Sequence, residues 1–417
     1  MRGVRPGLGR MVRKRKQLSV MEKRNDGAKR VLVIGELDGY ANSLKPVAIE
    51  QFLREHGHDV RLVDTYSLSR ASGAAGSLRR KLPAWTPKKV ALYAVEAAAR
   101  LLTRRWGFGR RRLSYYMLLA NHQLRRSILK SALPIDDFDL VICETPHDAG
   151  VLTVDTTART LYDCPTPWAD ELFLEGRLTE SQHERQRQRE KRLFESVDHL
   201  AFHWESYAGY AREQYGLTGR NVMVMNFGCT LAAERARFDE PPRVVYLGSL
   251  GSRFIDLPLL ARLARAYPYI DVYGGPPPDP RLGLNYLGHT SPDILSQYQL
   301  GLITCTDDPL RREGFSAKHL EYLAAGLPVL VPAWRSHLEN LRGSVVYTEP
   351  TFPLVIGTLS NEKQWRKLSD EAYAQARRLT WDITLRPLEA LLANAPVPGD
   401  TCDDHVSAAP HPFGHAG

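Results

Sequence analysis

The sequence predicts an α/β fold made of two domains, each built on a parallel β-sheet. Three observations favour it: short continuous apolar runs typical of buried parallel strands, helical periodicity between those runs, and a charged segment that separates two such series. With 417 residues, of which 43% are hydrophobic, the chain is long enough for two domains with a core each. This composition excludes a disordered or fibrous chain.

The first series begins with the apolar run 31–34, which indicates a buried strand and is followed by a loop that ends at Gly39. Apolar positions at helical spacing predict a helix over 44–56, which Gly57 ends, and 58–63 is the next predicted strand. This β-α-β unit indicates a parallel sheet. Further strands are expected at 139–143, 159–162, 199–202 and 222–225.

The second series follows residues 231–243, which are charged, carry two prolines near their end and mark the expected domain boundary. It comprises predicted strands 244–247, 269–273, 284–287, 300–304 and 328–332 and helices 256–267, 292–299 and 317–325. Two Rossmann-like domains of this kind face a central cleft, and ligands bind at the carboxyl ends of the strands. The expected division is a disordered basic tail over 1–29, domains over 30–235 and 243–380, a helix over 381–395 and a disordered tail over 396–417.

The formal charge of +9 comes from the N-terminal tail. Residues 1–30 hold eleven Lys and Arg against two acids, whereas the rest of the chain holds 45 of each sign, so the net charge gives no argument for a nucleic-acid partner.

No uncharged stretch reaches the length of a membrane-spanning helix. Five cysteines at wide, unpatterned spacings argue against a disulfide framework and a zinc ribbon. A cytoplasmic location is expected.

The stretch 312–329 indicates an anion site. Gly314, Ser316 and Ala317 open a predicted helix, whose first backbone amides are unpaired donors. Lys318 lies in the first turn, where a cation is unfavourable against the helix macrodipole unless an anion lies nearby. The same pattern also fits an ordinary amphipathic helix with solvated charges.

Two glutamates with seven residues between them, Glu313 and Glu321, lie in this stretch within EGFSAKHLEYLAAGLPV. They resemble the E-x7-E signature of the retaining glycosyltransferases of family 4, and more closely the subgroup whose helix contains S-x-K-x-x-E-Y-L-A-A-G-x-P-V. Weaker resemblance covers most of 31–395. It implies the GT-B fold, in which the helix expected at 381–395 crosses back to the first domain.

The resemblance implies transfer of a sugar from a nucleoside diphosphate donor to a hydroxyl acceptor with retention of the anomeric configuration. Glu321 would accept hydrogen bonds from the nucleotide ribose, and Glu313 would lie near the hydroxyls of the donor sugar. Lys318 and Arg253 would contact the diphosphate, which gains charge as it leaves, so no metal or cofactor is expected. The other donor-binding residues expected are Gly248, Gly314, Phe315, Ser316 and Ala317.

Three residues of the first domain are candidates on the acceptor side: Asp163, His147 and Gly39. Asp163 ends the predicted strand 159–162, where many family members carry a histidine beside the sugar. It could position the acceptor or support its deprotonation, although an Asp at a strand end is also a common turn former. The D-x-D string at 137–139, a metal-ligand pattern in other glycosyltransferases, is interpreted as a solvated loop.

Residues 70–130 hold fifteen basic residues against a single acid, Glu96, and aromatic residues alternate with the basic clusters. This composition suits an anionic lipid surface. Residues 100–126 are expected to contact the inner face of the membrane peripherally or to recognise an anionic acceptor such as a polyprenyl diphosphate. The alternative is a helical pair with solvated arginines, so the acceptor is left open between a lipid-linked and a soluble molecule.

Two other functions fit the same fold, a nucleotide-sugar epimerase and a non-catalytic sugar-nucleotide binding protein. Specific binding of nucleic acid is not expected, because Glu313 and Glu321 would repel phosphodiesters. Glycosyl transfer in the synthesis of a glycoconjugate, a polysaccharide or a glycosylated natural product is the favoured hypothesis.

Overall fold

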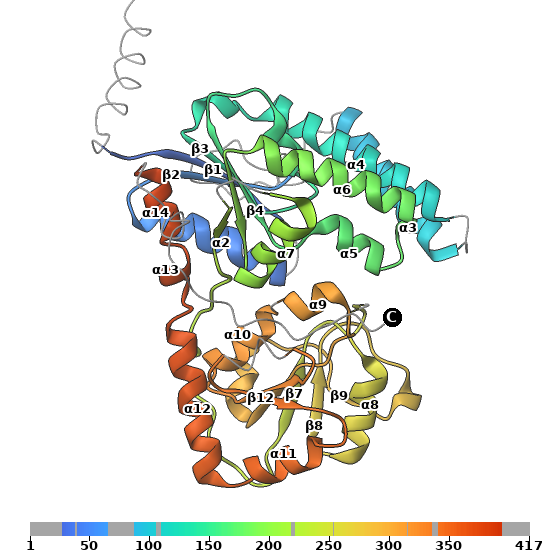
Figure 1. Ribbon diagram of the computed structural model, residues 1–417, viewed down its shortest axis with the longest axis vertical. Coiled ribbons are helices and arrows are strands. Elements are labelled where there is room, and N and C mark those ends of the chain that lie inside the picture. The colour runs from blue at the N-terminus through green and yellow to red at the C-terminus, as the bar shows by residue number, and fades with distance from the viewer. Residues whose placement is uncertain are drawn as a thin grey trace, which may run out of the picture. The chain divides into compact units, whose positions relative to one another are not determined.

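The computed structural model describes residues 27–37, 40–65, 87–105, 110–217, 222–252, 254–314, 316–335 and 341–393. In these ranges the chain forms two six-stranded parallel sheets with helices around them (Figure 1). The strand orders are β2-β1-β3-β4-β5-β6 and β12-β11-β10-β7-β8-β9. The predicted α/β fold with two parallel sheets is confirmed.

Every strand of the first sheet lies within two residues of its predicted position. The strands are β1 (Arg30–Ile34), β2 (Asp59–Val63), β3 (Leu140–Cys143), β4 (Arg159–Cys164), β5 (His199–Phe202) and β6 (Val222–Val224). Central strands are buried on both faces, as in β3, because helices cover both sides of a parallel sheet. One prediction needs correction: β4 continues to Cys164, so Asp163 lies inside the strand and does not follow it.

The helices associated with these strands include the predicted one at 44–56, which the structure extends by a turn toward the N-terminus. They are α2 (Tyr40–Glu55), α3 (Pro87–Arg105), α4 (Arg110–Ala132), α5 (Trp168–Leu174), α6 (Glu180–Ser196) and α7 (Glu205–Tyr215), with the 3₁₀ turns η2 (Ile135–Asp137) and η3 (Ala149–Thr153). Helix α6 begins in a capping box, because the Thr179 hydroxyl and the Gln182 side chain each accept a hydrogen bond from the other residue's backbone N–H.

The second sheet contains β7 (Val244–Leu247), β8 (Ile270–Tyr273), β9 (Asn285–Tyr286), β10 (Leu300–Leu302), β11 (Val329–Pro332) and β12 (Ser344–Tyr347). Its helices are α8 (Leu257–Ala266), α9 (Pro309–Glu313), α10 (Ala317–Ala324), α11 (Phe352–Leu359), α12 (Glu362–Arg377), α13 (Trp381–Thr384) and α14 (Pro387–Leu392), with the 3₁₀ turns η4 (Pro280–Leu282) and η5 (Pro292–Gln297). The helix predicted at 292–299 is therefore a 3₁₀ turn and not an α-helix. The strand β12 and the helices α9, α11 and α12 were not predicted, and the helix predicted over 381–395 is divided into α13 and α14.

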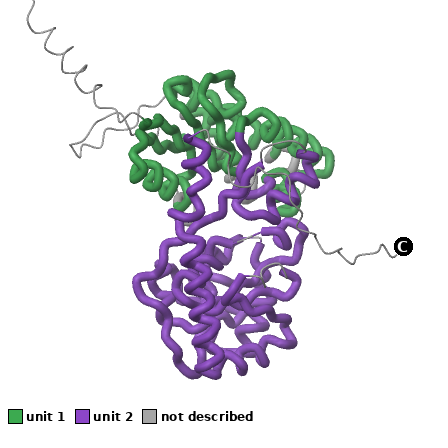
Figure 2. Tube along the Cα trace, turned by 60° about the vertical axis from the view of Figure 1, so that its left-hand side comes forward, with its two compact units in different colours: residues 1–163, 168–198 green, residues 164–167, 199–417 purple. Residues whose placement is uncertain are grey.

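Contacts divide the chain into two compact units, residues 1–163 with 168–198, and residues 164–167 with 199–417 (Figure 2). The second unit takes in β5, β6 and α7, so it begins earlier in the chain than the boundary expected at 231–243. Within it, α13 packs on the loop after β6, because Trp381 meets the Phe227 ring edge-on at 5.0 Å. Among the described residues, no helix is both long and apolar enough to span a lipid bilayer.

Candidate active site

Lys318 lies at the carboxyl edge of the second sheet, in the first turn of α10. Its ammonium donates a hydrogen bond of 2.9 Å to the Tyr246 hydroxyl and lies 4.4 Å from the centre of the Tyr246 ring. A Cβ atom at Gly248, directly after β7, would stand 2.5 Å from the Lys318 nitrogen. The missing side chain at Gly248 therefore leaves the space that the ammonium occupies.

Burial, with a smaller effect of the positive charge of Arg335, lowers the pKa of Lys318 to about 8, although Cys305 and Glu321 act in the opposite direction. In the described part of the chain, no carboxylate pairs with the ammonium. Removing an ammonium from water without a counter-charge is costly. The site thus holds a cation that an incoming anion would stabilise.

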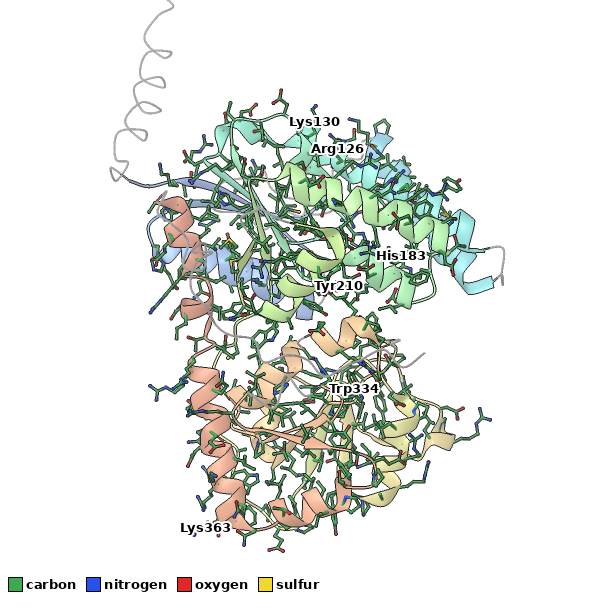
Figure 3. All side chains as sticks on the ribbon, in the orientation of Figure 1. Arg126, Lys130, His183, Tyr210, Trp334 and Lys363 are labelled. Carbon is green, nitrogen blue, oxygen red and sulfur yellow. The ribbon has the colours of Figure 1, made fainter. Side chains whose placement is uncertain are left out.

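A second cation at this edge, Arg335, was not selected from the sequence. It follows β11, is 4% exposed, and donates a hydrogen bond to the Gly314 carbonyl. Another of its nitrogens lies 3.7 Å from the Cys305 sulfur, while Nε is buried with no hydrogen-bond partner. Nowhere in the described ranges does a carboxylate pair with this guanidinium. Figure 3 labels Trp334, its neighbour in the same loop.

A third cation, Arg311 of α9, was also missed. Its guanidinium stacks over the Phe254 ring at 3.4 Å. Burial raises the pKa of the Cys305 thiol, and the charges of Arg335, Lys318 and Arg311 each lower it. The Cys305 thiol, which follows β10, thus has three cations around it. One follows β11, one lies in α9 and one lies in α10.

The N-terminus of α10 adds backbone donors to this cationic cluster. Ser316 is the N-cap residue in an extended conformation, and its side chain makes no capping hydrogen bond. The N–H of His319 already bonds to the Ser316 carbonyl at 2.9 Å. Among the described residues the N–H groups of Ala317 and Lys318 have no acceptor, as expected for the first turn of a helix. Unpaired amides beside cations are an arrangement that suits an anion.

The two glutamates of the motif flank this site. Glu321 is partly buried and lies three residues after Lys318, which places both on one face of α10. Burial raises the pKa of Cys229 to about 12, and the negative charge of Glu321 contributes to that shift. Glu313 is the last residue of α9, and its carbonyl accepts a hydrogen bond of 2.5 Å from the Ser206 hydroxyl.

Two further glycines shape the loop that carries Gly248. Gly274 and Gly275 follow β8 with φ of +97° and +70°, a conformation that favours glycine. A Cβ atom at either position would overlap backbone atoms of Gly248 or Leu250. The sequence signal was a Gly-Gly pair directly after a predicted strand. Of the other predicted residues, Arg253, Phe315 and Gly39 lie outside the described residues.

On the first unit, Asp163 forms a fully buried ion pair. Its carboxylate lies 2.8 Å from the Lys45 ammonium, and both side chains are 0% exposed. Glu144, directly after β3, has a pKa well above its usual range because it is buried and lies near the negative charge of Asp163. Lys45 opposes that shift. The predicted residue Asp163 thus belongs to a buried group of one cation and two carboxyls.

His147, predicted on the acceptor side, lies beside a second imidazole. His147 Nδ1 and His122 Nε2 are 3.3 Å apart, and the His147 ring meets the Trp168 ring edge-on at 5.1 Å. Burial lowers the pKa of His147 to about 3 and that of His122 to about 4, and nearby Arg125 adds to both shifts. Both imidazoles are therefore neutral at pH 7 and are weak bases.

No family model matches the chain, and no curated protein matches it. Solved structures do. A sucrose-phosphate synthase from Thermosynechococcus elongatus has a TM-score of 0.60 and 11% identity, over 88% of this chain and 98% of that one. An α,α-trehalose-phosphate synthase (UDP-forming) from Burkholderia vietnamiensis has a TM-score of 0.55 and 13% identity, over 88% of this chain and 100% of that one.

A third structure, an α,α-trehalose 6-phosphate synthase from Burkholderia multivorans, has a TM-score of 0.53 and 13% identity, over 88% of this chain and 96% of that one. These neighbours are glycosyltransferases built on two parallel-sheet domains. The similarity shows a common architecture. Because the sequence identities are low, the activity of this chain has to be argued from its own residues. The chain has the GT-B fold.

Proposed function

We propose that the protein is a glycosyltransferase of the retaining family 4 type that transfers a sugar from a nucleoside diphosphate donor to a hydroxyl acceptor. The observation that carries this proposal is a pair of cations, Lys318 and Arg335, that no carboxylate of the described residues neutralises. They stand beside the unpaired amides at the N-terminus of α10. A diphosphate offers the charge and the acceptor oxygens that this arrangement lacks.

The cations act mainly on the leaving group. As the bond between the sugar and the diphosphate breaks, negative charge builds up on the diphosphate oxygens, and fixed charges nearby stabilise that state more than the ground state. Glu321 binds the nucleotide ribose and Glu313 the hydroxyls of the donor sugar. Arg253 and Phe315 are proposed to complete the donor site.

The acceptor side is proposed to use Asp163 and His147 for positioning. Asp163 is held by Lys45 away from solvent, and the lowered pKa of His147 makes it a poor base at neutral pH. Neither side chain offers a nucleophile or a strong base. A front-face mechanism, in which the acceptor attacks on the side that the diphosphate leaves, fits this arrangement.

We also propose peripheral membrane contact through α3 and α4, with a lipid-linked acceptor. Val90, Tyr93 and Tyr116 are 50%, 43% and 60% exposed. Arg125, in contrast, is buried and pairs with Asp148 at 3.1 Å, so it is not part of a basic surface. A chain that begins at Lys29 should bind phosphatidylserine vesicles at low salt and leave them at high salt. Binding retained by the Tyr93→Ser, Tyr116→Ser double variant would contradict this.

The donor proposal is tested by a thermal-shift screen of the full chain against UDP, GDP, ADP and dTDP. At a concentration of 100 Kd, a ligand that binds only the folded state stabilises it by about 2.7 kcal/mol. The shift should disappear in Lys318→Ala and persist in the control Lys363→Ala, which removes an exposed lysine of α12 labelled in Figure 3. An equal shift in both variants, or none in the wild type with any of the four, contradicts the assignment.

A nucleotide-sugar epimerase is the second candidate, because Glu144 and Asp163 form a buried carboxyl pair at the sheet edge. General acid and base catalysis uses two carboxyls with different pKa values, and burial together with the charge of Asp163 holds the pKa of Glu144 well above its usual range. Incubation of the protein with UDP-sugars alone distinguishes the functions. An epimeric sugar nucleotide favours the epimerase, whereas slow hydrolysis favours the transferase.

A further inference from the structure

Two consecutive carbonyls of the loop between α9 and α10 are held by side chains from distant parts of the sequence. The Glu313 carbonyl accepts a hydrogen bond of 2.5 Å from the Ser206 hydroxyl, and the Gly314 carbonyl accepts one from Arg335. Ser206 lies in the first turn of α7, and Arg335 follows β11. Both contacts lie within the second unit.

Space around Gly314 shows how closely α7 approaches this loop. Gly314 has φ of −77° and ψ of 153°, which any residue can adopt, so its conformation does not require glycine. A Cβ atom at this position would nevertheless overlap the Tyr207 hydroxyl, and Tyr207 is 4% exposed. The loop is therefore packed against α7 as well as hydrogen-bonded to it.

We propose that Ser206 and Arg335 are positioning residues that fix two successive carbonyls, those of Glu313 and Gly314, and through them both the Glu313 side chain and the N-terminus of α10. This inference rests on the proposed function. Each peptide group is planar, so a hydrogen bond to its carbonyl restricts the orientation of the whole group, and here two successive peptide groups are restricted. A loop held only by its own ends would lose entropy when it orders around a donor.

The two residues differ in what else they do. Arg335 also supplies charge to the anion site, so its substitution would change binding and positioning together. Ser206 carries no charge, and its hydroxyl donates a hydrogen bond to the Glu313 carbonyl of the loop. Ser206 therefore offers the cleaner test, because its loss should affect the geometry of Glu313 without weakening attraction for the diphosphate.

The matched variants are Ser206→Ala, Ser206→Thr and Ser360→Ala. Ser360 also donates its hydroxyl hydrogen to a backbone carbonyl, that of Ile356 at 3.1 Å, but at the end of α11. In the full chain without ligand, Ser206→Ala should speed hydrogen exchange at the His319 amide, which bonds to the Ser316 carbonyl at 2.9 Å in the first turn of α10. Ser206→Thr, which keeps the hydroxyl, and Ser360→Ala should exchange as the wild type does.

Kinetics provide the second measurement. With UDP-glucose, GDP-mannose and dTDP-glucose as donors, Ser206→Ala should lower the turnover of donor hydrolysis about tenfold, because a loop that is less firmly held places Glu313 less accurately for the transition state. The Kd of the corresponding nucleoside diphosphate should change less than about twofold, because the substitution removes no charge from the site. Ser206→Thr should restore turnover.

Unchanged exchange and unchanged turnover in Ser206→Ala would overturn the inference. So would a loss of turnover that Ser360→Ala reproduces, because that would indicate a general effect on stability. If the wild type binds none of the nucleoside diphosphates, that result contradicts the proposed function, independently of the role of Ser206. The exchange measurement then still decides whether Ser206 holds the loop.

Discussion

The Lys318 ammonium and the Tyr246 hydroxyl are 2.9 Å apart, and the same ammonium lies 4.4 Å from the centre of the Tyr246 ring. A hydroxyl and a ring face stabilise a cation, but less than a carboxylate does. Burial remains the larger effect and lowers the pKa of Lys318 to about 8. The charge of Lys318 is thus present at neutral pH and lost in mild alkali, which makes ligand affinity depend on pH.

The affinity for UDP should fall as pH rises through about 8, because Lys318 then loses the proton that gives it its charge. A bound anion raises the pKa of the ammonium, so binding and proton uptake are linked. Isothermal titration on both sides of this pH measures the effect. In Lys318→Arg the guanidinium stays charged, so the loss of affinity at high pH should be absent. The same pH dependence in both proteins would exclude Lys318 as its source.

Glu321→Gln should weaken nucleotide binding without unfolding the protein. A hydrogen bond to a charged acceptor contributes about 1.5–3 kcal/mol, which corresponds to a loss of affinity of about ten- to a hundredfold. Circular dichroism of the variant checks the fold, and titration with UDP, GDP and dTDP measures affinity. The control is Glu213→Gln, an exposed glutamate of α7. Affinity unchanged for all three nucleotides would remove Glu321 from the site.

Gly314→Ala should impair turnover because its methyl group overlaps the Tyr207 hydroxyl. Overpacking of a filled site costs about 1–3 kcal/mol. Tyr207→Phe removes the nearest overlapping atom, so the double variant Gly314→Ala, Tyr207→Phe should recover part of the lost turnover and stability. Denaturant unfolding and donor hydrolysis of the three variants test this. If the two substitutions add independently, Gly314 and Tyr207 are not in the contact that the structure shows.

Acid should destabilise the protein through His122 and His147. Their pKa values in the folded protein, about 4 and about 3, lie below the ordinary value of 6.5. Between these pKa values and 6.5, the unfolded chain therefore binds more protons than the folded protein does. The free energy of unfolding should therefore fall as pH is lowered from 6.5 toward 4. Urea unfolding at pH 7, 6 and 5 measures the slope, which the double variant His122→Gln, His147→Gln should flatten. An equal slope in the variant would show that other groups carry the acid sensitivity.

The strands of both sheets could be predicted because apolar runs such as 31–34 and 244–247 are local signals of burial. Local sequence gave no comparable signal for β12, whose residues are mostly only partly buried, or for the five-residue helix α9. The helix that carries Lys318 and Glu321 could be predicted in the same way, because helical spacing is also a local signal. Arg335 could not be found in this way, since its partners Gly314 and Cys305 lie 21 and 30 residues away in the chain.

The surroundings of Asp163 also depend on a residue that is distant in the chain, so local sequence could not predict them. The prediction placed Asp163 directly after its strand, but the residue lies inside β4, and its partner Lys45 lies in α2, far away in sequence. A strand-end Asp exposed to solvent and an Asp buried against a lysine look alike in sequence. Only the packed structure shows which of the two is present.

The buried pair Lys45 and Asp163 supports the last prediction. Lys45→Met leaves the Asp163 carboxylate buried without its cation, and Asp163→Asn leaves the Lys45 ammonium buried without its anion. Removal of one partner of a buried ion pair costs about 3–5 kcal/mol, so each single variant should lose that much free energy of unfolding. The double variant should be more stable than either single variant, because no uncompensated charge remains. Urea unfolding of the four proteins gives the coupling energy directly.

Donor hydrolysis by the same proteins separates stability from function. If Asp163 acts only by holding the first unit together, the double variant should recover turnover as it recovers stability. Turnover that stays low in a stable double variant would indicate that the carboxylate itself positions the acceptor. Additive losses of stability, with no coupling between the two substitutions, would mean that the charges of Lys45 and Asp163 do not compensate each other in the folded protein.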